Sequence, residues 1–154
     1  MMDRARHFFA RHIHTTGQAR NIEHRLQVAT AALLFEVMRT DGELKDSERR
    51  QVVVALEARF ALTAAETAEL LELAEAEARD ATDYYQFTSL INQYFSAEQK
   101  EQVVEQLWRV AYADLQIDRF ERTLVYKLAD LLYVPRAAQI AARDRAKRAA
   151  GLVS

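Results

Sequence analysis

The sequence predicts a small all-α protein, folded as one compact helical domain of about seven to eight helices, and three observations support this. Its 154 residues include only 3 Gly and 1 Pro, so the residues that break helices are nearly absent. Apolar residues recur at the three- and four-residue spacing of helices that bury one face. The pattern of the first half also returns in the second half, which indicates a duplicated unit of roughly four helices.

The first half is predicted to be helical almost throughout. A buried helix over about residues 21–40 ends at Asp41-Gly42, and a further helix begins near Asp46. The stretch Thr63-Ala-Ala-Glu66 has the spacing of a capping box, in which the side chain and backbone of two residues exchange hydrogen bonds at a helix start. Another helix is therefore predicted to open there.

The second half contains the same signals. Thr82-Asp83 offers side-chain oxygens that could cap a helix, and Ser96-Ala-Glu-Gln99 is a second capping box. A loop is predicted at residues 114–118, with a helix on each side of it. Pro135 suits the first turn of a final helix that runs to about residue 148.

A single offset aligns the two halves without a gap. The aligned polar pairs are Asp41 with Asp114, Glu48 with Glu121, and Arg49 with Arg122. Chance similarity between amphipathic helices would explain matching apolar positions, but it would not explain these charged matches. We therefore interpret the pattern as an internal duplication, and we predict that residues 104–133 superpose on residues 31–60.

These elements predict a single helical domain over residues 21–150, with repeat halves at about 21–80 and 83–150. Residues 1–20 precede it as an amphipathic segment that we expect to cap the core. Attachment of this segment to a membrane surface is a minor alternative, because it combines arginines with apolar side chains.

Composition excludes several classes of function. The chain has 21 basic and 23 acidic residues, and this near-neutral balance favours neither nucleic acid nor an anionic membrane surface. It has no cysteine, which excludes disulfides, thiolate metal sites and a cysteine nucleophile. No segment approaches the roughly 20 apolar residues of a membrane span, so we expect a cytoplasmic protein without stable membrane insertion.

Two acidic loops are the main candidates for a binding site. Each half places an Asp where one helix ends and a Glu seven residues later in the first turn of the next: Asp41 and Glu48, then Asp114 and Glu121. A tight connection can bring the two carboxylates together, and paired hard oxygen ligands suit Ca²⁺ or Mg²⁺. On spacing alone a simpler interpretation stays open, in which each Asp caps the following helix and each Glu favours its dipole. The twelve-residue EF-hand loop is absent.

The segments that contain these loops, Leu33 to Glu48 and Leu107 to Glu121, resemble the two signature segments of the tellurite-resistance TerB-like family. The stretch between them from Asp83 to Asn92 is similar as well, and the resemblance spans about residues 20–145. It implies an all-α duplicated fold with an acidic site that binds metal.

The resemblance also points to particular residues. Its metal ligands fall on Asp41, Glu48, Asp114 and Glu121, with Glu43 and Asp118 as less certain neighbours. The chain departs from the family pattern at Leu115, where the family usually has Gly. A loop that needs a positive φ at this position would be strained, which makes the second half-site the weaker of the two.

Other candidate features have ordinary explanations. His12 and His14 could hold Zn²⁺ or Ni²⁺, but solvated imidazoles in a terminal segment are the simpler interpretation. The last helix is basic, and a solvated face is expected there, with an acidic protein partner ranking above nucleic acid. No arrangement of a nucleophile and a base is recognisable, so we do not expect an enzyme.

Three hypotheses about function follow. The favoured one is a TerB-like, stress-associated binding module whose paired acidic loops hold a divalent cation or a cationic partner. The alternative is a purely structural protein-interaction domain without metal, similar to the helical module beside co-chaperone domains in related proteins. A metal-dependent hydrolase is the third. We expect a protein partner, and a homodimer is one option for it.

Overall fold

The helix-forming composition gives seven helices in the part of the chain that the computed structural model describes, which is residues 16–39, 46–113, 117 and 119–152, with 16–20 as backbone only. No strand occurs within those ranges, so the predicted all-α class is confirmed. The helices are α2 (Thr16–Met38), α3 (Asp46–Phe60), α4 (Ala64–Asp80), α5 (Tyr85–Tyr94), α6 (Ala97–Ala111), α7 (Arg119–Leu131) and α8 (Arg136–Ala149).

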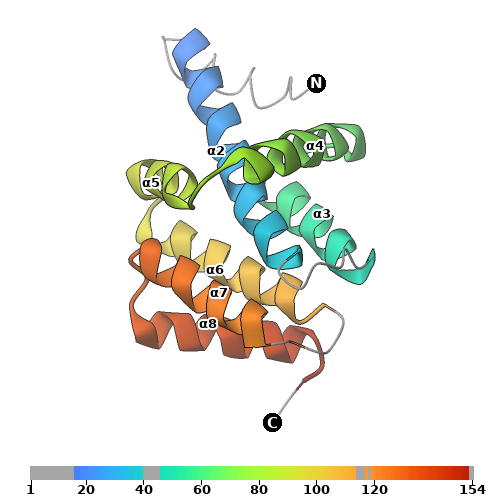
Figure 1. The fold of residues 1–154 in the computed structure, drawn as a ribbon, viewed down its shortest axis with the longest axis vertical. Helices are drawn as coiled ribbons and strands as arrows, with labels where there is room; N and C mark the ends of the chain where they lie inside the picture. Colours follow the sequence, from blue (N-terminus) through green and yellow to red (C-terminus); the bar gives the residue numbers. More distant parts are fainter. Residues whose placement is uncertain (1–15, 40–45, 114–116, 118, 153–154) are drawn as a thin grey trace.

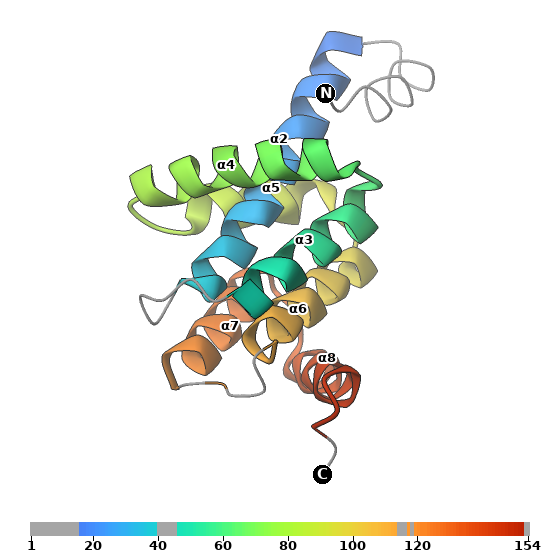
Figure 2. The same ribbon diagram turned by 90° about the vertical axis from the view of Figure 1, so that its right-hand side faces the viewer.

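Helix α2 forms the centre of the fold. From Ala29 to Met38 every side chain is buried, which agrees with an almost uninterrupted run of apolar residues that leaves no polar face for solvent. Helices α3, α4, α5, α6 and α7 all pack against α2, and α4 makes the largest contact. Figures 1 and 2 show α4 crossing α2, with α6, α7 and α8 grouped toward the end of the molecule where the chain finishes.

Two helix starts are fixed by the capping boxes that the sequence predicted. The Glu66 backbone N–H donates to Thr63 Oγ1 at 3.2 Å, and the Thr63 N–H donates to Glu66 Oε1 at 2.8 Å. Ser96 and Gln99 make the same exchange at 3.1 and 2.8 Å. Each box satisfies two backbone donors that a helix start leaves without partners, and so determines where α4 and α6 begin.

The start of α5 differs from its predicted form. Tyr84 occupies the cap position and its side chain makes no capping hydrogen bond, so of the predicted pair Thr82-Asp83 only Asp83 accepts a backbone N–H at this helix start. The Asp83 Oδ1 accepts this hydrogen bond from the Tyr85 N–H at 2.9 Å in a local turn. Pro135 immediately precedes α8 as its cap residue instead of lying in its first turn.

Helix α2 also begins earlier than expected, at Thr16 instead of residue 21. The last part of the predicted N-terminal segment 1–20 is therefore the first turn of the central helix, while residues 1–15 lie outside the described ranges. The stretch Thr15-Thr-Gly-Gln18 has the Ser/Thr-x-x-Glu/Gln spacing of a capping box, a signal for this start that the predicted boundary at residue 21 did not use.

The helix ends agree in register with the proposed duplication. Helices α2 and α6 end at Met38 and Ala111, and helices α3 and α7 begin at Asp46 and Arg119. Both pairs are separated by the 73 positions that also relate Asp41 to Asp114. The first half nevertheless contributes three described helices and the second half four, so the units differ in content, and their superposition remains a prediction.

Candidate functional site

Of the six acidic residues predicted to form a site, Asp41, Glu43, Asp114 and Asp118 lie outside the residues that the structure describes. The other two, Glu48 and Glu121, lie in the first turns of α3 and α7, as the sequence predicted. Their helices follow directly after the two loops. Ile117, which belongs to the second predicted loop, packs partly buried against the core.

Both glutamates are buried. Glu48 is 0% exposed and Glu121 is 1% exposed, and each takes part in a polar or electrostatic interaction. A first-turn glutamate that only favours the helix dipole can do so from the surface, as exposed Glu98 in the first turn of α6 does. Burying a carboxylate costs free energy that hydrogen-bond donors or cations must compensate. The burial of Glu48 and Glu121 therefore indicates that hydrogen-bond donors or positive charges compensate their carboxylates at these two helix starts.

The described residues by themselves do not form a complete set of metal ligands. Within 16–39, 46–113 and 119–152, no three side chains of the ligand types His, Asp and Glu come together. Of the six predicted ligands, the described residues include one in each half, Glu48 and Glu121, and both are buried. Their hard oxygen donors fit Ca²⁺, Mg²⁺ or Mn²⁺ and not a soft metal. Of the four histidines only His24 is described, in a pocket of about 330 Å³ that Glu77 also lines.

A second feature lies between the end of α2, the start of α5 and the first part of α7. There a pocket of about 520 Å³ is lined by eight residues: Glu36, Arg39, Tyr84, Arg119, Phe120, Thr123, Leu124 and Lys127. We call it the α2–α7 pocket. Arg39 is the last described residue before one acidic loop and Arg119 is the first residue of α7 after the other, so the pocket is bordered by the elements that flank both loops.

Sequence reasoning did not identify this pocket. The apolar spacing of α7 placed Phe120 on the same stripe as Leu124 and Leu128, which predicts a buried side chain. In the structure Leu128 is fully buried, whereas Phe120 is 63% exposed.

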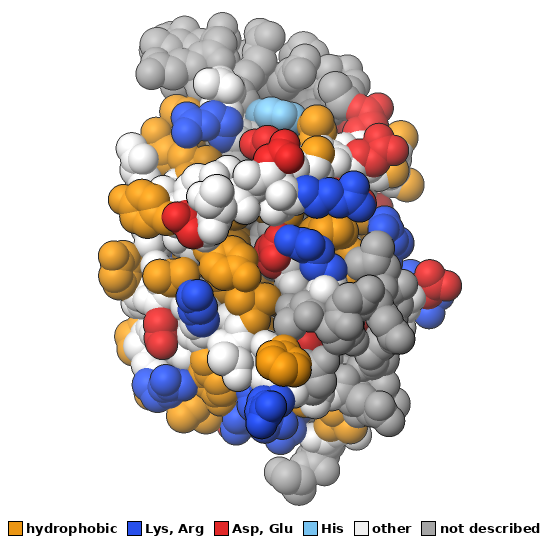
Figure 3. All heavy atoms as spheres, in the orientation of Figure 1, with side chains coloured by type: hydrophobic (Ala, Val, Ile, Leu, Met, Phe, Trp, Pro, Cys, Tyr) orange, Lys and Arg blue, Asp and Glu red, His pale blue; other side chains and the backbone are white. Residues whose placement is uncertain are grey.

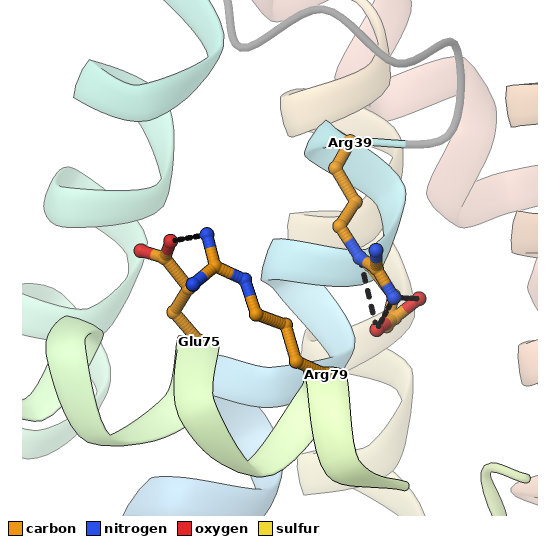
Figure 4. A network of polar contacts seen from close by, with 4 residues as sticks. Arg39, Glu75 and Arg79 are labelled. Atoms are coloured by element: carbon orange, nitrogen blue, oxygen red, sulfur yellow. Dashed lines mark hydrogen bonds and ion pairs between the residues drawn. The ribbon is translucent and has the colours of Figure 1, made fainter. Parts of the chain in front are cut away.

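Charged groups surround the Tyr84 side chain in the α2–α7 pocket. The Arg39 guanidinium donates to both carboxylate oxygens of Glu36, with a closest distance of 2.9 Å. Figure 4 shows Arg39 bending back along α2 to reach this carboxylate, while Glu75 and Arg79 form a separate pair on α4. Burial raises the pKa of the Tyr84 hydroxyl, Glu36 raises it further, and Arg39 lowers it. Tyr84 is therefore a neutral hydroxyl at the wall of the pocket.

The chain was compared with protein-family models, solved structures and curated proteins. Residues 27–144 match the family model described as tellurite resistance protein TerB. A crystal structure of a protein of unknown function from Porphyromonas gingivalis is similar at a TM-score of 0.61 and 20% identity, covering 81% of this chain and 95% of that one. This second likeness concerns the fold alone. No curated protein matches the chain.

Proposed function

Because the chain belongs to the family of tellurite resistance protein TerB, we propose that it is a stress-associated binding module whose two acidic loop-to-helix junctions hold a divalent cation or a cationic partner. Family membership rests on residues 27–144, which include both junctions. The proposal makes the chain a binding protein and not an enzyme, and it assigns it a protein partner in the cytoplasm.

The observation that carries the proposal is the burial of Glu48 and Glu121 at corresponding helix starts. A carboxylate that is removed from water is most stable when positive charge or several donors face it. A cation bound between each glutamate and the aspartate seven residues before it would supply that charge. The positive end of the helix dipole would supply only part of it.

In the first half Asp41 and Glu48 would hold the cation, with Glu43 beside them. In the second half Asp114 and Glu121 would do so, with Asp118 as the neighbour. A bound cation would neutralise the carboxylates and hold the two helices of each half together at their junction. The chain's own residues bind and orient the cation, and no step of bond cleavage is proposed.

Titration of chelator-stripped protein with Ca²⁺, Mg²⁺, Mn²⁺ and Zn²⁺, followed by calorimetry and melting temperature, tests the proposal. A cation that binds only the folded protein raises the free energy of unfolding by about 2.7 kcal/mol at a hundredfold excess over Kd. We expect such a rise for at least one hard cation. It should disappear in the double variant Asp41→Ala/Asp114→Ala.

Glu98→Gln is the matched control, since Glu98 also lies in a first turn but is exposed. It should respond to the cation as the unmodified protein does. A flat response to every cation, together with aspartate variants that lose about 1 kcal/mol each without metal, would reject the metal site. That result would favour the alternative of a structural interaction domain whose acidic residues only cap helices.

A further inference from the structure

We propose that the α2–α7 pocket binds a small aromatic phosphate, that is, a compact ligand in which a phosphate group is attached to a flat ring. Three features of the pocket support this: its excess of cationic side chains, its exposed aromatic ring and its size. The proposal concerns a different set of residues from the acidic junctions and does not rest on cation binding there.

The charge of the pocket favours an anion. Among the described residues that line it, Arg39, Arg119 and Lys127 are cationic and Glu36 is the carboxylate. Glu36 is engaged by Arg39, as an ion pair of 2.9 Å. Among the described contacts, the other two cations lie against rings and not against carboxylates. The Arg119 guanidinium carbon is 5.5 Å from the centre of the Phe120 ring, and Lys127 Nζ is 5.4 Å from the centre of the Tyr84 ring.

These ring contacts leave hydrogen-bond donors available. A cation held over an aromatic face is oriented by the electrostatics of the ring but keeps N–H groups that can donate to an oxyanion. Arg39 and Lys127 line the same pocket as Tyr84, and Lys127 Nζ lies over the Tyr84 ring. The phosphate would therefore bind between these two cations, which come from different helices.

The flat ring of the ligand would lie at the other end of the pocket. Phe120 is 63% exposed, and it lies seven residues before Lys127 on the same face of α7, about 10 Å along the helix axis. An exposed aromatic ring next to a guanidinium offers a stacking surface for a second ring. The length between the two ends suits a ligand with a phosphate at one end and a ring at the other.

The pocket is also of a suitable size. Its volume of about 520 Å³ lies within the roughly 300–1,000 Å³ of sites for small molecules. Buried Leu124 forms part of its floor between the two ends. An acidic peptide would use the same cations, but it would not need the ring of Phe120, so the two occupants can be separated by experiment.

The test is a titration of the full chain with naphthyl phosphate, which carries a flat ring and a dianion, in a buffer that contains a metal chelator. Naphthol, inorganic phosphate and a peptide of glutamates are the comparison ligands. We expect saturable binding of naphthyl phosphate, at least about tenfold tighter than that of either fragment. Lys127→Gln and Phe120→Ala should each weaken binding by about tenfold or more.

Two further variants sharpen the result. Glu36→Gln should tighten binding, because it removes the carboxylate found among the described lining residues and releases Arg39 from this ion pair. Arg148→Gln removes an exposed arginine on α8, outside the pocket, and should leave the affinity unchanged. Melting temperatures establish that all variants are folded, and the changes at Phe120, Lys127 and Arg148 are expected to preserve the fold because these side chains are exposed.

Several outcomes would overturn the proposal. They are an absence of saturable binding by naphthyl phosphate, equal binding of inorganic phosphate with no effect of Phe120→Ala, and an equal loss of affinity in Arg148→Gln and Lys127→Gln. Tighter binding of the glutamate peptide would overturn it as well, and would identify the pocket as a docking site for an acidic segment of a protein.

Discussion

At the scale of single residues, glutamates at equivalent helix positions in this protein differ in how far they are exposed to solvent. Glu48, Glu98 and Glu121 all lie in the first turn of a helix, where a negative charge is favoured. Only Glu98 is exposed. The same position in a helix thus carries a solvated charge in α6 and a buried one in α3 and α7. The helix dipole is enough to explain the position of exposed Glu98. The burial of Glu48 and Glu121 depends in addition on the residues around each junction.

Glu105 shows a third situation, a carboxylate that joins two helices. Its Oε2 accepts a hydrogen bond from Arg109 on the same helix at 2.9 Å, and its Oε1 accepts one from Arg145 on α8 at 2.6 Å. Desolvation raises the pKa of Glu105, but the hydrogen bonds and charges of Arg145 and Arg109 outweigh it, and the net effect lowers the pKa below the ordinary 4.5.

This lowered pKa predicts a pH dependence of stability. The carboxylate binds protons more weakly in the folded protein than in the unfolded chain, so its contribution is present above pH 4.5 and is lost as the pH falls through the folded pKa. Glu105→Gln should remove this contribution. The loss at neutral pH should be about 1 kcal/mol or less, because the two arginines stay 40% and 44% exposed.

Urea unfolding of Glu105→Gln, Arg145→Gln and the double variant at neutral and acidic pH measures the effect. The two single changes should not be additive at neutral pH, since they remove the same contact between α6 and α8. Strict additivity, or a pH profile of Glu105→Gln that equals that of the unmodified protein, would show that the pair contributes nothing to stability.

At the scale of helices and their ends, the capping residues do the most to set where the chain turns. Thr63 and Ser96 both exchange hydrogen bonds with the third residue of the helix they begin. Thr82 has the same kind of side chain in front of α5, but the cap position there is occupied by Tyr84, and it is Asp83 that accepts a hydrogen bond from the N–H of the first residue of the helix. Residue type alone therefore does not predict which threonine or serine makes a capping hydrogen bond.

Alanine substitutions test this distinction. Thr63→Ala and Ser96→Ala should each lower the free energy of unfolding by about 1 kcal/mol, because each leaves a backbone N–H of its helix start without its acceptor. Thr82→Ala is the matched control and should change stability by less than about 0.5 kcal/mol. Chemical denaturation of the three variants gives the comparison. An equal loss for Thr82→Ala and Thr63→Ala would contradict the assignment of caps.

At the scale of the whole molecule, the two predicted halves share a single core. Helix α2 of the first half packs against α5, α6 and α7 of the second, and α3 packs against α6. Leu33, Leu34 and Val37 are fully buried in this arrangement. Figure 3 shows the resulting exterior, where lysine and arginine side chains lie over the region of α7 and α8 at the lower end of the view.

This shared core predicts that neither half folds alone. Residues 21–80 expressed without the second half would expose the face of α2 that α6 and α7 cover, and the isolated segment should lose most of its helical circular dichroism and its cooperative melting. Mixing it with residues 83–150 should restore both. A cooperative thermal transition of either half by itself would show that the two units are independent domains.

No helix among the described residues is long and apolar enough to cross a membrane. This finding agrees with the sequence, in which the long apolar run of α2 is shorter than a span and is interrupted by polar residues such as Gln27 and Thr30. Both of these polar side chains are buried against other helices. The run therefore marks the central helix of a helical core.

The sequence by itself determined the properties that depend on neighbours along the chain. These are the all-α class, from propensity and apolar spacing, the starts of α4 and α6, from their capping boxes, and the first-turn positions of Glu48 and Glu121. Only the tertiary structure decided that both glutamates are buried, that Phe120 is exposed, and that Arg39, Tyr84 and Lys127 meet in one pocket. Burial and convergence depend on which helices pack together, and such contacts join residues that no local pattern relates.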